Sequence, residues 1–410
     1  MNKRSLLVLS MSLLLCLSIS FGQIRAQGET QTVHNISSDL NYGTIQEAIN
    51  APETVDGHVI FVEPGTYYEN VLVSKSIELR GDNKETTIID GGGNSTVISI
   101  NRDRVAVTGF TIRNGSGQTY AAGISLSSAR MCNIIDNNIM NCEVGVLITG
   151  AADARVVANT ITNNNVGLLM HGMASNNALT RNSFDLNAQA VYIEDSSSNS
   201  IYSNTVSNCS SDGVYLSSSD GNNLGENIVT QCAENGVVLS HCSENTLIKN
   251  SITQNTKNAV WLQYAEDCNI TQNVFENNGG GILLTESSTN SIVSNDFKDN
   301  LVAVTVSTSN TNMFYNNNFV DNTEQVVSTT STNSWDNGVQ GNHWSDYQGT
   351  YNNTVGETPY VIDEQNQDNF PAMDTFVIPE FSTMVSLIAV VTFVFATAVF
   401  YKRKLGNKTV

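Results

Sequence analysis

The residues of this chain that could do chemistry are mostly carboxylates, because its 410 residues include 39 Asp and Glu but only 19 Lys and Arg, a formal net charge of −20. Two neighbouring carboxylates can serve as the acid and the base of glycoside cleavage. Few basic residues accompany the acids, so we interpret the acids as solvated surface groups. The negative net charge argues against nucleic acid as a partner. The acids closest to one another on the repeat described below are Glu194, Asp195, Asp220, Glu244 and Asp267.

Two groups of residues have the donor atoms of a metal site. Oxygen ligands suited to a structural Ca²⁺ occur near the C-terminal end of the repeats. Soft ligands suited to copper occur at Met170-His171-Gly172-Met173 and at His241-Cys242. The repeat places Met170 and Met173 in inward columns and His171 outside, so we expect core packing there and no copper. The predicted calcium ligands are Asp336, Asp346, Asp363 and Asp368.

A row of large apolar residues recurs once per repeat on the outward side of a predicted strand. Exposed rows of this kind usually mark a contact surface. The aromatic members Tyr192, Tyr215 and Trp261 could stack on sugar rings, with Ser217, Ser240 and Gln263 supplying hydrogen bonds. The alternative is cross-strand stacking that stabilises the sheet by itself. The row comprises Leu147, Leu169, Tyr192, Tyr215, Val238, Trp261 and Leu283.

The element that must position these residues is a repeat of 22 or 23 residues, and an asparagine marks each copy. A period of this length indicates a solenoid, in which each coil buries its apolar face against its neighbours. We predict that each asparagine lies in a tight bend, where its amide bonds to its own turn and to the coils above and below. The predicted ladder comprises Asn137, Asn159, Asn182, Asn204, Asn227, Asn250, Asn273, Asn295 and Asn317.

Three apolar columns per repeat indicate three short strands per coil. A small residue, always Gly or Ala, opens each unit, and aliphatic residues two apart follow it, as in Gly145, Val146 and Ile148. Two more apolar columns flank the asparagine. Three strands in 22 or 23 residues leave no room for a helix, so the sequence predicts an all-β parallel β-helix of about twelve coils.

The chain divides into five predicted segments. Residues 27–122 form an N-terminal cap and irregular opening coils, in which Thr44-Ile45-Gln46-Glu47 predicts the start of a short amphipathic helix ending at Ala51. Residues 123–334 are the regular repeats. Residues 335–376 are rich in aromatics and are expected to close the C-terminal end. The two remaining segments, 1–26 and 377–410, carry the localisation signals.

Localisation is predicted from the two ends. Residues 1–26 combine a basic start with an apolar run, which is typical of a signal peptide. In 377–410, an apolar stretch of the length of a transmembrane helix precedes Lys402-Arg403-Lys404, which places the acidic bulk outside the cell. The predicted protein is membrane-anchored at the cell surface. Sequons that allow N-glycosylation are Asn35, Asn94, Asn114, Asn208, Asn269 and Asn352.

Six cysteines follow the apolar start of the chain. An even number in a secreted chain suggests disulfides. Cys209 and Cys232 fall in one column of adjacent coils, about 4.8 Å apart, which suits a disulfide or a buried thiol stack, and we favour the stack. The six are Cys132, Cys142, Cys209, Cys232, Cys242 and Cys268.

Several segments resemble known families. Ile45-Gln46-Glu47-Ala48-Ile49, Pro64-Gly65-Thr66-Tyr67 and Ile89-Asp90-Gly91 are similar to the opening coils of pectin-lyase-like proteins, which implies a right-handed helix. Gly341-Asn342-His343-Trp344-Ser345-Asp346-Tyr347 and Thr358-Pro359-Tyr360 resemble the end of NosD-like proteins. Ile378-Pro379-Glu380-Phe381 resembles archaeal PEF-type sorting signals, which implies that a transpeptidase replaces the C-terminal helix with a lipid anchor.

Three functions follow as hypotheses. The first is a non-catalytic surface module that binds a surface polysaccharide or a surface-layer protein. The second, implied by the NosD resemblance, is a copper accessory that works with an ABC transporter. The third is a carbohydrate-active lyase or hydrolase. The galacturonase and pectin-methylesterase signatures are absent from the sequence, which argues against this third hypothesis. Fold alone does not decide among them.

Overall fold

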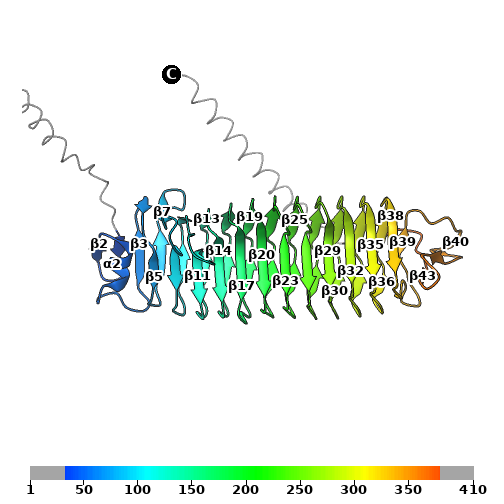
Figure 1. The fold of residues 1–410 in the computed structure, drawn as a ribbon, viewed down its shortest axis with the longest axis horizontal. Helices are drawn as coiled ribbons and strands as arrows, with labels where there is room; N and C mark the ends of the chain where they lie inside the picture. The colour runs from blue at the N-terminus through cyan, green and yellow to red at the C-terminus, as the bar shows by residue number, and fades with distance from the viewer. Residues whose placement is uncertain (1–32, 379–410) are drawn as a thin grey trace, which may run out of the picture.

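The computed structural model describes residues 33–378, which form a long rod of stacked coils (Figure 1). The predicted signal peptide, and the predicted anchor from residue 379 onward, lie outside the described residues. Within residues 33–378, no helix is long and apolar enough to cross a membrane. The rod contains the repeats and the caps at both of their ends.

Within the described residues the strands form three long sheets, each with one strand per coil, and two short hairpins. The first sheet has 14 strands, in the spatial order β2 (Leu40–Tyr42), β1 (Val33–Asn35), β3 (Val59–Val62), β6 (Glu78–Gly81), β9 (Ala106–Thr108), β12 (Asn133–Ile135), β15 (Arg155–Val157), β18 (Ala178–Thr180), β21 (Ser200–Tyr202), β24 (Asn223–Gly225), β27 (Thr246–Ile248), β30 (Asn269–Thr271), β33 (Ser291–Val293) and β36 (Met313–Tyr315).

The second sheet has 13 strands and follows the asparagine bend in each coil. Its order is β39 (His343–Trp344), β37 (Asn318–Val320), β34 (Asp296–Lys298), β31 (Val274–Glu276), β28 (Ser251–Thr253), β25 (Ile228–Thr230), β22 (Thr205–Ser207), β19 (Ser183–Asp185), β16 (Thr160–Thr162), β13 (Asn138–Met140), β10 (Thr111–Arg113), β7 (Thr87–Asp90) and β4 (Gly65–Tyr67).

The third sheet has 12 strands and carries the aromatic row. Its order is β38 (Glu324–Thr329), β35 (Val302–Ser307), β32 (Gly280–Thr285), β29 (Asn258–Gln263), β26 (Val237–Ser240), β23 (Val214–Ser217), β20 (Gln189–Glu194), β17 (Val166–His171), β14 (Val144–Thr149), β11 (Ala122–Ser127), β8 (Ile98–Ile100) and β5 (Val71–Val73). The hairpins β40 (Tyr351–Asn352) with β41 (Val355–Gly356), and β42 (Tyr360–Val361) with β43 (Gln367–Asp368), lie in the C-terminal cap.

Neighbouring coils pair in parallel and in register, so like residues stack on like. Ile139, for example, pairs with Ile161, and Phe275 pairs with Phe297. The inward columns are fully buried and merge into one continuous core. The opening column needs small residues because the backbone of the next coil approaches closely there: a Cβ on Gly145 would lie 2.4 Å from the carbonyl oxygen of Gly167. The predicted parallel β-helix is confirmed.

The nine predicted asparagines lie in the bend between the first and second sheets, and their amides bond from coil to coil. Asn204 shows the pattern: its backbone N–H and its Nδ2 both donate to Asn227 Oδ1, at 2.9 and 3.0 Å, and Nδ2 also donates to the Leu179 carbonyl. The last member, Asn317, donates in the same way to Asn342. Each buried amide is thus satisfied by the next coil.

Two further asparagine ladders occupy the other two bends, and sequence analysis missed both. Their members obey the same rule; Asn278 N and Nδ2, for instance, donate to Asn300 Oδ1. One ladder comprises Asn164, Asn187, Asn255, Asn278, Asn300 and Asn322. The other comprises Asn177, Asn199, Asn222, Asn245, Asn290, Asn312, Asn333 and Asn366.

The six cysteines are free and buried. Five stand in the columns of the two further ladders where an asparagine is lacking, and Cys242 stands in a neighbouring column that holds Ser196 and Ser219. Cys209 and Cys232 interrupt the ladder between Asn187 and Asn255, and the Cys232 N–H donates to Asn255 Oδ1 at 3.0 Å. The thiol contact with Cys232, together with burial, raises the pKa of Cys209. Burial raises the pKa of Cys142 and Cys242 to about 11. These thiols are therefore protonated and unreactive, as in the predicted stack.

The N-terminal end is covered by the short helix α2 (Ile45–Asn50). Thr44 caps the helix by accepting from Glu47 N, as the sequence predicted. Gln46 then mimics a missing strand at the edge of the third sheet, because its amide accepts from Leu72 N at 2.7 Å and donates to Leu72 O at 3.1 Å. Glu69 accepts from the first helical N–H groups, and Lys75 Nζ donates to the carbonyls that follow the last turn.

The C-terminal end is closed by stacked aromatic rings and by carboxylates. Trp344 stacks between Phe319 and Tyr360, with ring centroids 4.2 and 4.1 Å away, so the core column of the second sheet continues into the cap. Asp368 is fully buried and stands where the next ladder asparagine would be: its Oδ2 accepts from Asn342 N at 2.7 Å and from Trp344 Nε1 at 2.9 Å.

One predicted glycosylation site is wrong. Asn35 is fully buried in β1, where its amide donates to Thr54 and its oxygen accepts from Ser37 N. A glycan on this nitrogen has no space in the folded chain. The sequons at Asn94, Asn208, Asn269 and Asn352 lie at exposed positions, and Asn114 is half-buried.

Candidate functional site on the outer face of the third sheet

The predicted aromatic row lies on the outer face of the 12-stranded sheet, one residue per coil. The pairing register places Leu169, Tyr192 and Tyr215 side by side, followed by Val238, Trp261 and Leu283. Outward and inward residues alternate along each strand, so the polar residue two positions later shares this face. The row is therefore bordered by a second column, Thr149, His171, Glu194, Ser217, Ser240, Gln263 and Thr285.

The row has two parts that differ in accessibility. At its N-terminal end, Leu147 and Leu169 are only 8% and 3% exposed, because they pack with Ala122 and Val144 into a small apolar cluster outside the main core. Further along, Tyr192, Tyr215 and Trp261 are half-buried and present part of each ring to solvent. The part able to contact a ligand runs over four coils, from Tyr192 to Trp261.

Tyr192 and Tyr215 form a ring pair on this surface. Their ring centroids are 5.5 Å apart at an interplanar angle of 81°, so the two rings are nearly perpendicular. The Tyr192 hydroxyl donates to Glu194 Oε1 at 3.3 Å. Burial and the nearby Glu194 carboxylate raise the pKa of Tyr192 to about 12, which keeps this hydroxyl a donor at physiological pH.

The far end of the exposed row is built around Trp261. Val238 lies between Tyr215 and Trp261 in the register and is fully buried by its neighbours. Trp261 Nε1 donates to Thr285 Oγ1 at 3.3 Å, which fixes the indole on the sheet. Beside it, His241 stacks on Tyr264 with centroids 4.7 Å apart, and the Tyr264 hydroxyl donates to Glu286. The stacked rings of His241 and Tyr264 thus form a second aromatic group at this end of the exposed row.

Two of these residues, Tyr120 and Tyr264, were missed by sequence analysis, which considered His241 only as a soft metal ligand. Tyr120, in the connection between β10 and β11, lies 5.8 Å from the His171 ring. His241 and Tyr264 sit in the turn that follows the third sheet, both with positive φ. Tyr120 lies outside the regular repeats, so no column could have indicated it. Tyr264 could have been found by aligning the position three residues after Trp261 across the coils.

The candidate acids do not converge. Asp220 Oδ1 accepts from Ser243 N at 2.7 Å, and Glu194 is bonded to Tyr192. Glu244 and Asp267 are exposed in the turns after the third sheet. Within residues 33–378, no three His, Cys, Asp or Glu side chains gather into a group that could hold a metal ion. The face offers hydrogen-bond acceptors and rings, and no shared carboxylate site.

The four aspartates of the predicted calcium site are not brought together by the structure. Asp368 and Asp363 end two asparagine ladders, since Asp363 accepts from Asn366 Nδ2 at 2.8 Å. Asp336 accepts from Asn369 N and Nδ2, and Asp346 accepts from the Tyr360 hydroxyl. Their oxygens serve the backbone and amide donors of the cap. Asp363 and Asp368 thus terminate ladders, whereas Asp336 and Asp346 bond within the cap.

The soft-ligand cluster is also divided. Met170 is fully buried, with its sulfur 3.8 Å from Asn177 Nδ2, and Cys242 is buried inside the coil. The prediction that Met173 points inward is wrong: it is 84% exposed, at a φ of 63°, because Ala174 occupies the inward column. Met170 and Met173 thus lie on opposite sides of the coil wall and cannot share a ligand.

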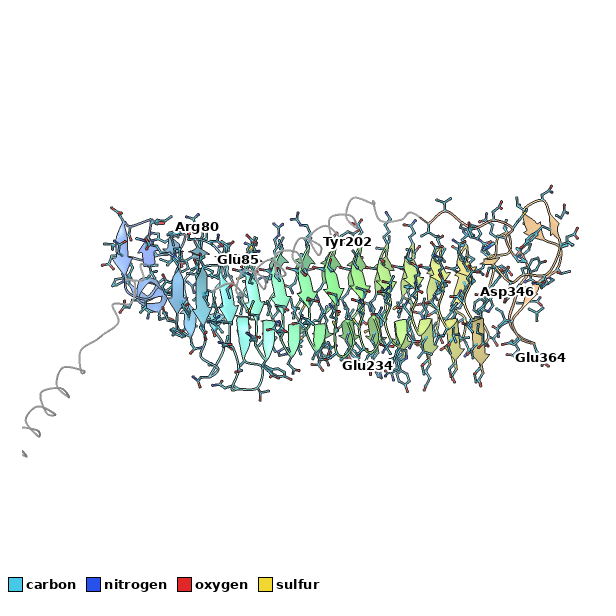
Figure 2. All side chains as sticks on the ribbon, turned by 90° about the horizontal axis from the view of Figure 1, so that it is seen from above. Arg80, Glu85, Tyr202, Glu234, Asp346 and Glu364 are labelled. Atoms are coloured by element: carbon cyan, nitrogen blue, oxygen red, sulfur yellow. The ribbon has the colours of Figure 1, made fainter. Side chains whose placement is uncertain are left out.

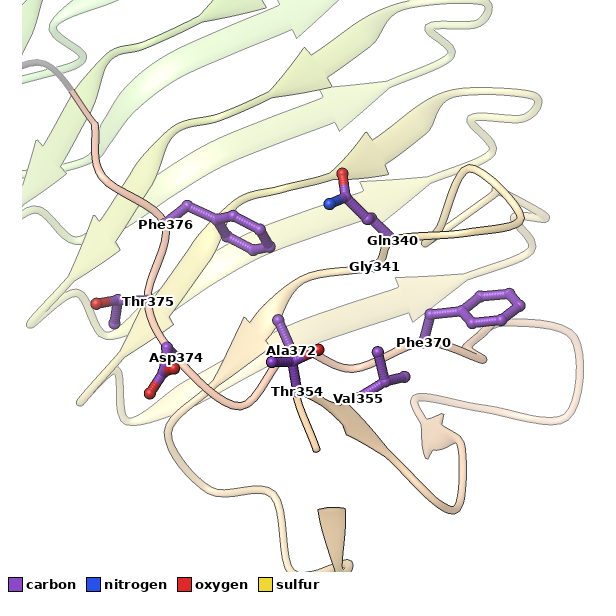
Figure 3. A pocket seen from close by; sticks show the side chains of 9 residues that line it. All are labelled: Gln340, Gly341, Thr354, Val355, Phe370, Ala372, Asp374, Thr375 and Phe376. Atoms are coloured by element: carbon purple, nitrogen blue, oxygen red, sulfur yellow. The ribbon is translucent and has the colours of Figure 1, made fainter. Parts of the chain in front are cut away.

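A pocket of about 220 Å³ lies in the C-terminal cap (Figure 3) and contains no member of the aromatic row. The segment that leaves the cap forms one wall. Asn318 holds this segment, because its Oδ1 accepts from Phe376 N at 2.7 Å and its Nδ2 donates to Phe376 O at 2.9 Å. The pocket is lined by Gln340, Gly341, Thr354, Val355, Phe370, Ala372, Asp374, Thr375 and Phe376.

Two family models match the chain. The model described as "Periplasmic copper-binding protein (NosD)" matches residues 186–349, and the model "Right handed beta helix region" matches residues 95–247. A cell surface glycoprotein of Methanothermus fervidus is 35% identical over 129 residues, which are 32% of this chain and 20% of that protein. A probable pectinesterase/pectinesterase inhibitor of Arabidopsis thaliana is 36% identical over 98 residues, 22% of this chain and 19% of that protein. The chain spans about a fifth of the length of these curated relatives.

Solved structures share the fold at low sequence identity. The A-module of a mannuronan C-5 epimerase from Azotobacter vinelandii is 13% identical with a TM-score of 0.51, over 73% of this chain and 87% of that one. The Dettilon tailspike protein is 16% identical with a TM-score of 0.56, over 66% and 61% of the two chains. At these identities the likeness concerns the fold alone. The sequence matches and the three-sheet coil together show that the chain is a NosD-like, pectin-lyase-like right-handed parallel β-helix protein.

Proposed function

We propose that this protein is a cell-surface β-helix whose exposed aromatic row binds an extended glycan without cleaving it. The observation that carries the proposal is the row itself: Tyr192, Tyr215 and Trp261 stay half-exposed on a flat, rigid sheet, while Leu147 and Leu169 in the same column are buried. Sugar rings stack on aromatic faces, and the neighbouring polar column supplies hydrogen-bonding groups.

The spacing of the row suits a linear chain of sugars. Strands of adjacent coils lie about 4.8 Å apart, which is comparable to the length of one pyranose unit in an extended polysaccharide. Tyr192 and Tyr215 are one coil apart, and Trp261 follows two coils later. Ser217, Ser240 and Gln263 run beside them, one per coil. A glycan lying along the rod would therefore meet a repeated set of contacts.

Location at the cell surface is part of the same proposal. It is supported by the predicted signal peptide and anchor, by the similarity to a cell surface glycoprotein and by the periplasmic description of the matching family. The copper-accessory and carbohydrate-active hypotheses remain predictions from the family resemblance. Within residues 33–378, the soft ligands and the carboxylates are separated, and the observations there favour glycan binding over both.

The test is titration of the purified chain with linear glucan, mannan and N-acetylglucosamine oligomers. Tryptophan fluorescence is a direct probe, because Trp335 and Trp344 are buried and Trp261 alone of the three tryptophans reaches solvent. We expect at least one oligomer to bind. The double variant Tyr215→Ser, Trp261→Ser, followed by calorimetry, should bind at least about tenfold more weakly, a change of about 1.4 kcal/mol.

The matched control is Tyr202→Ser, Tyr315→Ser, which removes two half-buried tyrosines from the 14-stranded sheet. In Figure 2, Tyr202 lies on the opposite side of the rod from Glu234, which precedes β26 of the 12-stranded sheet. The control should bind like the parent chain. The proposal would be contradicted by unchanged binding in Tyr215→Ser, Trp261→Ser, or by a parent chain that binds none of the oligomers.

A further inference from the structure

We infer that the glycan bound by this face carries a positively charged amino group, which is held by the rings of Tyr192 and Tyr215 and by the carboxylate of Glu194. This inference rests on the proposed glycan-binding function and specifies the class of ligand. It concerns the N-terminal part of the exposed row, where the nearly perpendicular rings and a carboxylate occur together.

The geometry suits an organic cation. A cation is attracted to the face of an aromatic ring, most strongly where two rings meet at an angle and water is partly excluded. Tyr192 and Tyr215 provide two such rings at 81°. Glu194 lies two residues after Tyr192 on the same side of β20, and the Tyr192 hydroxyl donates to its Oε1 at 3.3 Å.

The charge of the surrounding surface has one sign. None of the 12 strands of this sheet contains a lysine or an arginine. Asp195 is exposed directly after Glu194, and Asp212 lies on the neighbouring coil. The nearest cation along the row, Lys257, is already paired with Glu234. An anionic polysaccharide would be repelled here, whereas an amino sugar would find compensation without displacing a protein cation.

Two nearby groups complete the surroundings. His171 stands beside Glu194 in the polar column, and its Nε2 lies 3.0 Å from Thr149 Oγ1. Tyr120 covers the other side of the His171 ring. Protonated His171 would compete with a cationic ligand for Glu194, so the test includes a variant without this imidazole. The remaining neighbours of the ring pair, Ser217 and Val238, carry no charge.

The test compares two oligomers of equal length, glucosamine oligomers and their N-acetylated counterparts, in which the charged amine is replaced by a neutral amide. Calorimetric titration of the full chain at about pH 6 keeps the sugar amines largely charged. We expect at least about tenfold tighter binding of the amino form and a decrease in that preference with added salt. Glu194→Gln should remove most of the preference, and Tyr215→Ser should weaken binding of the amino form.

Two further variants separate the outcomes. Glu286→Gln removes one charge beside Trp261 and Tyr264 and should leave the preference unchanged. His171→Gln removes the competing imidazole and should keep the preference or increase it, so a preference lost in this variant would overturn the assignment to Glu194 alone. Equal binding of the two oligomers would overturn the amino-group inference while leaving glycan binding intact. A preference that survives Glu194→Gln would overturn the assignment to this carboxylate. Binding of a lysine-rich peptide, with no binding of either oligomer, would overturn both and make this face a docking surface for a basic protein.

Discussion

The backbone groups in the middle of the rod and at its two ends need the same hydrogen-bond partners, and different side chains provide these partners in the two regions. In the middle, each bend is completed by an asparagine of the next coil, as Asn204 is by Asn227. At the ends there is no next coil. The N-terminal end uses Gln46 on the edge of β5, and the C-terminal end uses Asp368 below Asn342. A repeat can therefore be extended with one residue type, whereas each end needs its own solution.

The largest effect on stability is expected from replacing the side-chain amide of one asparagine in the middle of a ladder with a carboxylate. Asn227 Nδ2 donates to Asn250 Oδ1 and to the Ile201 carbonyl, and the residue is only 3% exposed. Asn227→Asp keeps the shape but places an oxygen against both acceptors. With two buried bonds lost at about 1–3 kcal/mol each, we expect the free energy of unfolding to fall by about 3 kcal/mol or more, measured by denaturant titration.

The control for this change is Asn223→Asp, four residues earlier in the same coil. Asn223 is exposed at the start of β24, so the same change of charge should cost less than about 0.5 kcal/mol. Similar losses in the two variants would show that added negative charge, rather than the ladder, governs stability in this acidic protein.

This contrast also explains what the sequence could predict. The repeating interior was predictable because register copies one residue type from coil to coil, and one column, Asn137 to Asn317, sets the number of coils and the inward faces. Two ladders were missed because Cys209, Cys232 and Cys268 interrupt their columns. At the C-terminal end, Asp363 and Asp368 looked like cation ligands. A carboxylate that terminates a ladder occurs only once, so no repeating column in the sequence shows that it belongs to the ladder.

A second prediction concerns Asp368 and the pH dependence of the C-terminal end. Burial raises the pKa of Asp368 to about 6. The N–H donors of Asn342, Trp344 and Phe370 favour the carboxylate and oppose this rise. The unfolded value is about 3.9. The folded chain thus holds the proton more tightly, so stability falls as pH rises from about 4 to 6, by up to about 3 kcal/mol, and is level above that range.

Asp368→Asn removes this titration. We expect the difference in unfolding free energy between the parent and the variant to change between about pH 4 and 6 and to be constant above it. Thermal or denaturant unfolding across this pH range measures it. Parallel profiles for the two proteins would show that Asp368 titrates normally and that the buried ladder terminus carries no pH dependence.

A third prediction is that the interrupted ladder can be completed. Asn164 and Asn255 occupy the same space, beside Gly145 and Gly236, that Cys232 occupies beside Gly213. In Cys209→Asn, Cys232→Asn, the new amides would accept from Asn187 and donate to Asn255. We expect unfolding under reducing conditions to require about 1 kcal/mol more free energy. The double alanine variant should be less stable than the parent.

If the asparagine pair destabilises the chain as much as the alanine pair does, then the thiols pack better than an amide at this position. The difference would show that the ladder is not uniform along the rod. The middle would then contain at least one coil whose bend is stabilised by burial of sulfur rather than by hydrogen bonds.

The smallest effect on stability, and the sharpest test of the ends, is expected at Gln46. Its amide bonds to both backbone groups of Leu72, so Gln46→Ala leaves the edge of β5 open, while the buried face of α2, formed by Ile45, Ala48 and Ile49, stays in place. The half-buried site makes a loss below about 1 kcal/mol expected. An open strand edge pairs with other chains, so sedimentation should show concentration-dependent self-association. Glu53→Ala, an exposed change just beyond the helix, should remain like the parent. If Gln46→Ala is equally monodisperse, the polar mimic contributes only stability, and the bulk of the helix is what keeps rods from joining end to end.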